Sequence, residues 1–176
     1  CSEYPDAGVY CLDLRLGARD RIKWLEAAAG AARRLGDRWG EGNRLGNLGL
    51  AYAALGEARR AVEYHEQALA IHRAIGDRRG EGADLGNLGN AYADLGEARR
   101  AVEYYEQALA IAREICAAST EGSPEWTAGR RGEGNHLGNL GLAYAALGEA
   151  RQAVDYYEQA LAIAREIGDR RGEGKR

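Results

Sequence analysis

The segment Leu45–Asp77, LGNLGLAYAALGEARRAVEYHEQALAIHRAIGD, decides the fold because the chain repeats it. A second copy runs from Leu85 to Ile115, at a spacing of 40 residues, and a third runs from Leu137 to Asp169. Self-similarity at a period of this length is typical of proteins that are built from stacked repeats. We therefore predict an array in which each copy folds as one unit.

Each copy carries two apolar patterns of helical period, which are separated by a Leu-Gly pair such as Leu55-Gly56. In the first half, Leu45, Leu48 and Tyr52 form one helical stripe. The second half has two adjoining stripes, which indicate a helix that packs on more than one side. We predict an all-α fold of antiparallel helical hairpins, which stack because a single hairpin cannot bury its broad faces.

The joints between copies carry helix-ending signals. Gly36-Asp37, Gly76-Asp77 and Gly168-Asp169 each place a glycine where a helix closes in a left-handed residue, and an aspartate where the next helix needs an N-cap. Glycines also recur inside the first helix of each copy. Because a glycine there destabilises a helix by about 0.5 to 1 kcal/mol, their recurrence predicts close helix approach.

We expect one domain over residues 1–176. It comprises a degenerate first hairpin at 1–36, repeats at 37–76, 77–115 and 130–168, and the start of a further repeat at 169–176. Residues 116–129 form an insertion, in which Ser123-Pro124-Glu125 predicts a helix start and leaves Ala117–Gly122 as the loop. Trp126 is expected to pack on a neighbouring helix, or alternatively to contact a partner.

These residues resemble the tetratricopeptide repeat family, and the pattern covers about three quarters of the chain. The early Trp and the closing Pro of the family pattern are absent. The Leu-Gly-Asn signature resembles the Leu-Gly-Asn branch of the family, and it resembles kinesin light chain more distantly. The resemblance implies a right-handed superhelix whose first helices line a concave groove. The family's Leu, Gly, Tyr, Ala, aromatic and Ala positions fall on Leu48, Gly49, Tyr52, Ala61, His65 and Ala68; on Leu88, Gly89, Tyr92, Ala101, Tyr105 and Ala108; and on Leu140, Gly141, Tyr144, Ala153, Tyr157 and Ala160.

Composition limits the classes of function. The net charge is -3 and the pI is near 5.7, which disfavours a nucleic-acid or anionic-membrane partner. Three cysteines are too few for a disulfide framework, and we find no signal peptide or membrane-spanning stretch, so we expect a cytoplasmic protein. Arg and Glu alternate on the helix faces, and we interpret them as a solvated surface.

No catalytic or metal-binding pattern is apparent, and we expect no enzyme activity and no cofactor. The histidines are His65, His72 and His136, and we find no Ser, Cys or Asp constellation around them. His65 occupies the position of Tyr105, which indicates a packing residue. His65 and His72 lie two helical turns apart without a third ligand, which argues against a metal site.

The candidate binding site is the face of each first helix that lies opposite its core stripe. An amide offers both a donor and an acceptor to a peptide backbone, and the family uses asparagines in this way. Alternatively, these asparagines brace adjacent helices. The groove has no Lys to clamp a terminal carboxylate, as some chaperone-binding members do. The predicted groove residues are Asn43, Asn47, Leu50, Asn87, Asn90, Asp94, Asn135, Asn139 and Leu142.

We interpret the chain as a protein-interaction module that binds a peptide or helix. The segments RIKWL at 21–25 and AARRLGD at 31–37 resemble the junction before the repeat array in bacterial signalling ATPases of the STAND class, which suggests a sensor or regulatory arm. The alternative is a free-standing scaffold. We expect the last helix, which carries Tyr156, Ala160, Ile163 and Ile167, to lack a covering hairpin and to favour self-association.

Overall fold

The computed structural model describes residues 17–173, and their side chains as far as Gly168. This range contains seven α-helices and no strand, in agreement with the predicted all-α repeat array. The first helix predicted within residues 1–16 lies outside the described residues. The helices are α2 (Ala18–Leu35), α3 (Arg38–Ala54), α4 (Ala58–Ile75), α5 (Arg78–Asp94), α6 (Ala98–Ala118), α7 (Pro124–Ala146) and α8 (Ala150–Glu173).

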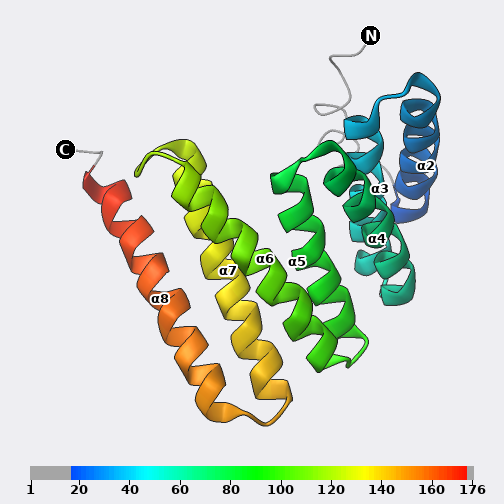
Figure 1. Ribbon diagram of the computed structural model, residues 1–176. Helices are drawn as coiled ribbons and strands as arrows, with labels where there is room; N and C mark the ends of the chain where they lie inside the picture. The colour runs from blue at the N-terminus through cyan, green and yellow to red at the C-terminus, as the bar shows by residue number, and fades with distance from the viewer. Residues whose placement is uncertain (1–16, 174–176) are drawn as a thin grey trace.

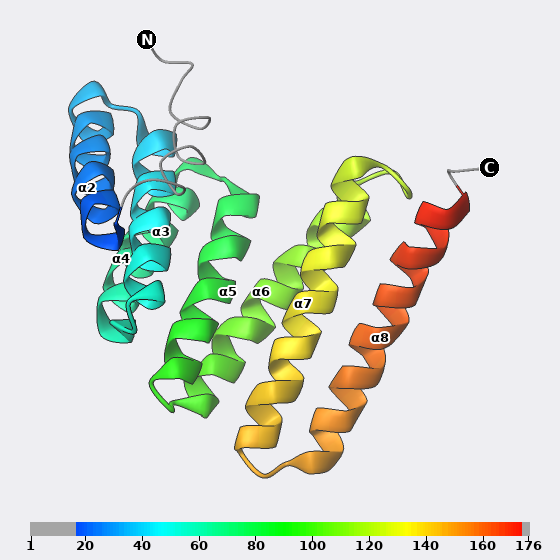
Figure 2. The ribbon, with the colours of Figure 1, turned by 180° about the vertical axis from the view of Figure 1, so that it is seen from behind.

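The helices form a right-handed superhelical array of two layers, in which each helix packs mainly on its neighbours in the chain. Helices α3, α5 and α7 face the viewer in Figure 2, whereas α4 and α6 lie in front in Figure 1. Helix α3 also touches α5, and α5 touches α7. The core runs along the array between the layers, as stacked hairpins require.

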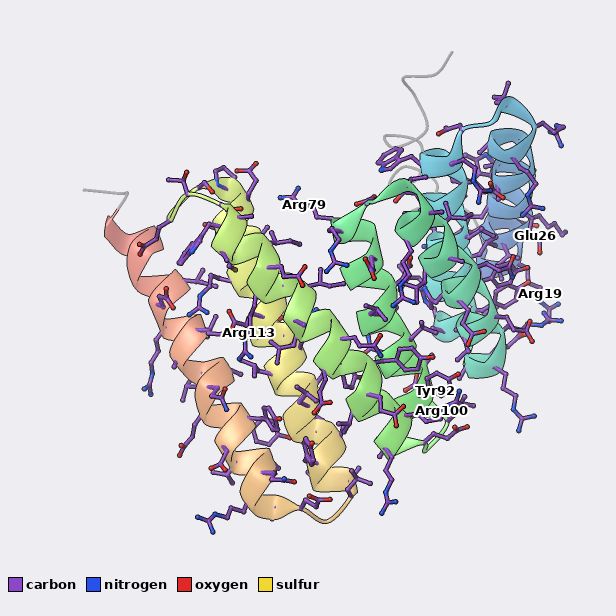
Figure 3. All side chains as sticks on the ribbon, viewed as in Figure 1. Arg19, Glu26, Arg79, Tyr92, Arg100 and Arg113 are labelled. Atoms are coloured by element: carbon purple, nitrogen blue, oxygen red, sulfur yellow. The ribbon has the colours of Figure 1, made fainter. Side chains whose placement is uncertain are left out.

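The same contacts hold each hairpin together. Two tyrosines stack with their ring centroids 5.2 Å apart in each of the three hairpins, as Tyr92 does with Tyr104. A glycine with positive φ, such as Gly96, closes the turn. The guanidinium of Arg100 covers the ring of Tyr92 at 3.9 Å and donates to its hydroxyl (Figure 3).

The joints carry the predicted caps. Gly76 adopts a left-handed conformation with φ of 71°. The Asp77 carboxylate then accepts a hydrogen bond from the Gly80 amide at 2.9 Å, and the Asp37 carboxylate accepts one from the Gly40 amide at 2.8 Å. Close helix approach is also found as predicted. A Cβ added at Gly89 would lie 2.4 Å from the ring of Tyr105.

A buried glutamate clamp, which the sequence interpretation missed, links successive hairpins. Glu81 of α5 accepts hydrogen bonds from Arg73 of α4 at 2.9 Å and from Arg78 of its own helix at 2.5 Å. Arg78 also pairs with Glu114 of α6. The arrangement recurs around Glu41, which binds Arg33 and Arg38, and around Glu133, which binds Arg113 and Arg130.

The insertion between repeats differs in length from its prediction. Helix α7 begins at Pro124, and the Ser123 hydroxyl caps it by accepting from the Trp126 amide at 3.1 Å. Trp126 is buried, with 9% of its surface exposed. Helix α6 continues to Ala118, so the expected loop at Ala117–Gly122 starts too early. No glycine or proline interrupts the stretch after Ile115, and α6 therefore gains almost a full turn.

The end of the array also departs from expectation. Helix α8 runs through Gly168 to Glu173, so Gly168-Asp169 does not form the predicted joint. A turn at Gly168 would break helical backbone hydrogen bonds, and the described residues contain no further helix whose packing would offset that loss.

The uncovered face of α8 is not the one that we predicted. Ile163 is buried with 5% exposure, and Tyr156, Ala160 and Ile167 are partly buried against the core. They face the interior because they continue the stripe that packs against α7. The exposed apolar residues are instead Val154, Tyr157 and Leu161, at 53, 38 and 49% exposure, and their counterparts in α6, Val102, Tyr105 and Leu109, are buried.

Candidate binding groove

Four of the nine predicted groove residues meet in one hollow between α5 and α7. This hollow has a volume of about 360 Å³, and the start of α6 forms its floor. Asn90 and Asp94 line it from α5, and Asn139 and Leu142 line it from α7. Leu142 is 63% exposed, which leaves an apolar contact surface beside the polar groups.

The amides of this hollow are held in place. The Asn90 side-chain oxygen accepts hydrogen bonds from the Tyr105 hydroxyl at 2.7 Å and from the Asn139 amide at 3.2 Å. Burial, together with the negative charge of Asp94, raises the pKa of Tyr105 to about 12. Tyr105 therefore keeps its proton at neutral pH and remains a donor. Asn139 thus links α7 to α5, which gives these two residues the bracing role that we considered as the alternative.

The other predicted residues are more dispersed. On α3, the Asn43 amide donates to the Trp39 carbonyl at 3.1 Å, Asn47 is half-buried, and Leu50 is 44% exposed. Asn87 is half-buried on α5. Asn135 lines a different hollow, between α7 and α8. The structure therefore places the predicted residues on the three first helices but gathers only the α5 and α7 members at one end.

Three buried residues between α4 and α5 form a cluster that the sequence interpretation missed. The Asp84 carboxylate lies 2.7 Å from Nδ1 of His72 and 3.6 Å from Nδ1 of His65. All three residues are at most 3% exposed. The ring of His65 packs against Gly49, as Tyr105 packs against Gly89, so its predicted packing role is confirmed. We expected no Asp near the histidines, and the position of Asp84 shows that this expectation was wrong.

Comparison between copies could have revealed this cluster. His72 stands where the later copies have Ala112 and Ala164, and Asp84 stands where the first and third copies have Arg44 and His136. Each is a departure from near-identical surroundings. Among the residues that the structure describes, no group of three or more His, Cys, Asp or Glu is arranged to hold a metal ion. Asp84 and His72 thus form a buried hydrogen-bonded pair, and His65 lies beside them with its Nδ1 without a hydrogen bond among the described residues.

Comparison with known proteins identifies the family. Two family models, both described as tetratricopeptide repeat, match residues 43–114 and 137–171. Together they cover more than half of the chain, which therefore belongs to the tetratricopeptide repeat family. No curated protein matches the sequence. Within the described residues, none of the helices has the length and apolar character that a membrane crossing needs.

Solved structures share the fold. BtubC (BKLC) from P. vanneervenii is 22% identical with a TM-score of 0.71, over 84% of this chain and 56% of BtubC. The chain thus spans little more than half of that relative. The putative kinesin light chain repeats of Podosopora anserina are 23% identical with a TM-score of 0.64, over 90 and 72% of the two chains. The TPR domain of Arabidopsis FLU is 19% identical with a TM-score of 0.63, over 73 and 98%.

Proposed function

We propose that this chain is a non-catalytic protein-interaction module, and that it holds an extended or helical segment of a partner along α3, α5 and α7. The hollow between α5 and α7 is the observation that carries the proposal. It combines ordered amides at Asn90 and Asn139 with the exposed side chain of Leu142. Membership of the repeat family supports binding of a protein partner, but not this particular site.

The chemistry of the amides fits a peptide backbone. No partner for the Asn90 amide nitrogen or the Asn139 side-chain oxygen occurs among the described residues, so a donor and an acceptor face the partner. Because Tyr105 fixes Asn90, little side-chain entropy is lost on binding. A neutral hydrogen bond contributes only about 0.5 to 1.5 kcal/mol net. Useful affinity therefore requires the faces of several repeats at once.

A peptide-array screen tests the groove directly. Segments that bind the wild-type chain should lose binding to an Asn87→Ala/Asn90→Ala variant of unchanged helicity. The matched control is Gln67→Ala/Gln159→Ala, because these amides lie on the outer helices and bond only to a backbone carbonyl four residues earlier. Equal retention by both variants, or equal loss, would refute the groove as the binding site.

We further propose that the module is the sensor or regulatory arm of a larger cytoplasmic signalling protein in bacteria. The resemblance of residues 21–37 to the STAND junction supports this context, and the alternative is a free-standing scaffold. Sequencing upstream of Cys1 separates the two. A phosphate-binding Gly-x-x-x-x-Gly-Lys-Ser/Thr loop in the same reading frame supports the sensor arm, whereas a start codon close to Cys1 contradicts it.

A second proposal is self-association of this chain through the outer face of α8. Val154, Tyr157 and Leu161 are exposed there. Their counterparts in α6, a helix on which α7 packs, are buried, so this face of α8 corresponds to one that receives another helix. The occupant that we propose is a second copy of the chain.

A further inference from the structure

A second hollow lies among α5, α6 and α7, near the N-terminal ends of α5 and α7. Its volume is about 340 Å³, which is within the range of small-molecule sites. The lining is mostly glycine, alanine and isoleucine, including Gly82 of α5, Ala112 of α6 and Gly132 of α7. Two polar side chains also line it, Arg79 and His136.

We call the space between two successive first helices an interval of the array. The first interval, which precedes the one that holds this hollow, shows which side chain can fill the equivalent space. There, between α3 and α5, α4 carries His72 in place of Ala112. A Cβ added at Gly42 would lie 2.7 Å from the His72 ring, and one added at Gly80 would lie 2.6 Å from it. The imidazole thus lies between two glycine backbones, and its Nδ1 is 2.7 Å from the Asp84 carboxylate.

The same slot is open in the second interval. Gly82 and Gly132 are the counterparts of Gly42 and Gly80, but Ala112 stands in place of His72, and Cγ2 of Ile111 would lie 3.0 Å from a Cβ added at Gly82. A Cβ added at Gly132 would lie 3.7 Å from the methyl group of Ala112. The array therefore repeats a slot that accepts a planar ring, without supplying the ring.

The polar groups at the slot differ from those in the first interval. His136 replaces Asp84, and its Nδ1 is buried without a hydrogen-bond partner among the described residues. Burial lowers the pKa of His136, so the imidazole is neutral at pH 7 and can donate or accept. Arg79 extends from the N-terminal end of α5 and has no ion pair within residues 17–168 (Figure 3).

We propose that this hollow binds a small planar aromatic carboxylate. The ring lies between Gly82 and Gly132, in the position that the His72 ring occupies one repeat earlier. The carboxylate pairs with Arg79, whose fork of donors suits a planar anion. His136 provides a further hydrogen bond. The site is distinct from the groove lined by Asn90 and Asn139, and its occupant is a free small molecule.

Calorimetric titration with 2-naphthoate tests the proposal. We expect saturable 1:1 binding to the wild-type chain. Neutral 2-naphthamide should bind about tenfold more weakly because it loses the charge-assisted contact, and non-planar cyclohexanecarboxylate should also bind about tenfold more weakly. No saturable binding of 2-naphthoate, benzoate or indole-3-acetate at millimolar concentration would overturn the proposal, as would equal affinity for all probes.

The His72–Asp84 pair of the first interval can be copied into the site to block it. An Ala112→His/His136→Asp variant copies the His72–Asp84 pair into the slot and should reduce 2-naphthoate affinity more than tenfold. The matched control is Ala164→His, which makes the equivalent change on the exposed face of α8 and should leave binding unchanged. Unchanged binding by a plugged variant of native helicity would overturn the proposal.

A third variant keeps the test decisive if the plugged chain does not fold. Arg79 is exposed, so Arg79→Ala should retain the fold. It should weaken 2-naphthoate about tenfold and leave 2-naphthamide unaffected. If both ligands keep their wild-type affinities, the carboxylate is not recognised at this place and the proposal is wrong.

Discussion

Removal of the buried carboxylate at one joint should destabilise the array strongly. Glu81 is 8% exposed and accepts hydrogen bonds from Arg73 and Arg78. A hydrogen bond to a charged group contributes about 1.5 to 3 kcal/mol. Both arginines are about half exposed, at 49 and 46%, so water and salt would reduce that contribution. We therefore expect Glu81→Gln to lower the free energy of unfolding by about 2 to 3 kcal/mol.

The effect should depend on pH. Burial alone would raise the pKa of Glu81, but the hydrogen bonds from Arg73 and Arg78 outweigh it and hold the pKa below its ordinary value. In an unfolded chain the pKa of Glu is about 4.3. Because the folded-state pKa is lower, the stabilisation is fully present above the unfolded value and is lost as the pH falls through the folded value.

Urea denaturation followed by circular dichroism measures this effect. The difference between the wild-type chain and Glu81→Gln should be constant near pH 7 and should shrink from about pH 5 towards about pH 2. Glu103→Gln is the matched control, because its side chain is exposed on α6. Equal losses in the two variants, or a difference that does not change with pH, would refute the assigned role of the clamp.

Three further predictions concern the core, the histidine cluster and the end of the array. Leu88 is fully buried, so Leu88→Ala should reduce the free energy of unfolding by about 2 to 5 kcal/mol, whereas Glu103→Ala should have little effect; equal losses in urea denaturation would disprove the assigned face. Asp84→Ala leaves the buried His72 imidazole without its acceptor and should reduce stability by about 1 to 3 kcal/mol in the same assay, so an unchanged midpoint contradicts the cluster. Leu161→Glu should reduce self-association in light scattering, and a wild-type chain that is monomeric at high concentration rules out the α8 interface.

The parts of the fold that could be predicted from the sequence are those with local causes. Helix periods, the Ser123 cap and the Gly76 joint each depend on residues within one or two turns, and the near-identity of the copies makes their stacking follow. The later end of α6 also has a local cause, because neither glycine nor proline follows Ile115 within that helix. The continuation of α8 past Gly168 could not be predicted in this way, since it depends on what packs next to the helix.

Long-range polar contacts were the main omission. The alternation of Arg and Glu predicts a solvated surface, yet Glu81 is buried, and an Arg-x-x-Glu spacing such as Arg78 to Glu81 recurs at each joint. Its burial arises only when a second arginine arrives from the preceding hairpin. The candidate groove was predicted from one face of the helix, and its residues were correctly assigned to the first helices. That the Asn90 amide already binds Tyr105 depends on the following helix, so a single-helix pattern could not indicate it.

The His65–Asp84–His72 cluster bears on how nearly identical units find their order. The first helices of these repeats resemble one another so closely that apolar packing alone would let α7 dock on α4 in place of α5. In that arrangement His136 would face His72, and Asp84 would be left without its hydrogen-bond partner His72. A buried acceptor without a donor costs about 1 to 3 kcal/mol, so the mismatched order is penalised. The cluster thus distinguishes one repeat from its copies and favours the docking of α5 on α4 over that of α7.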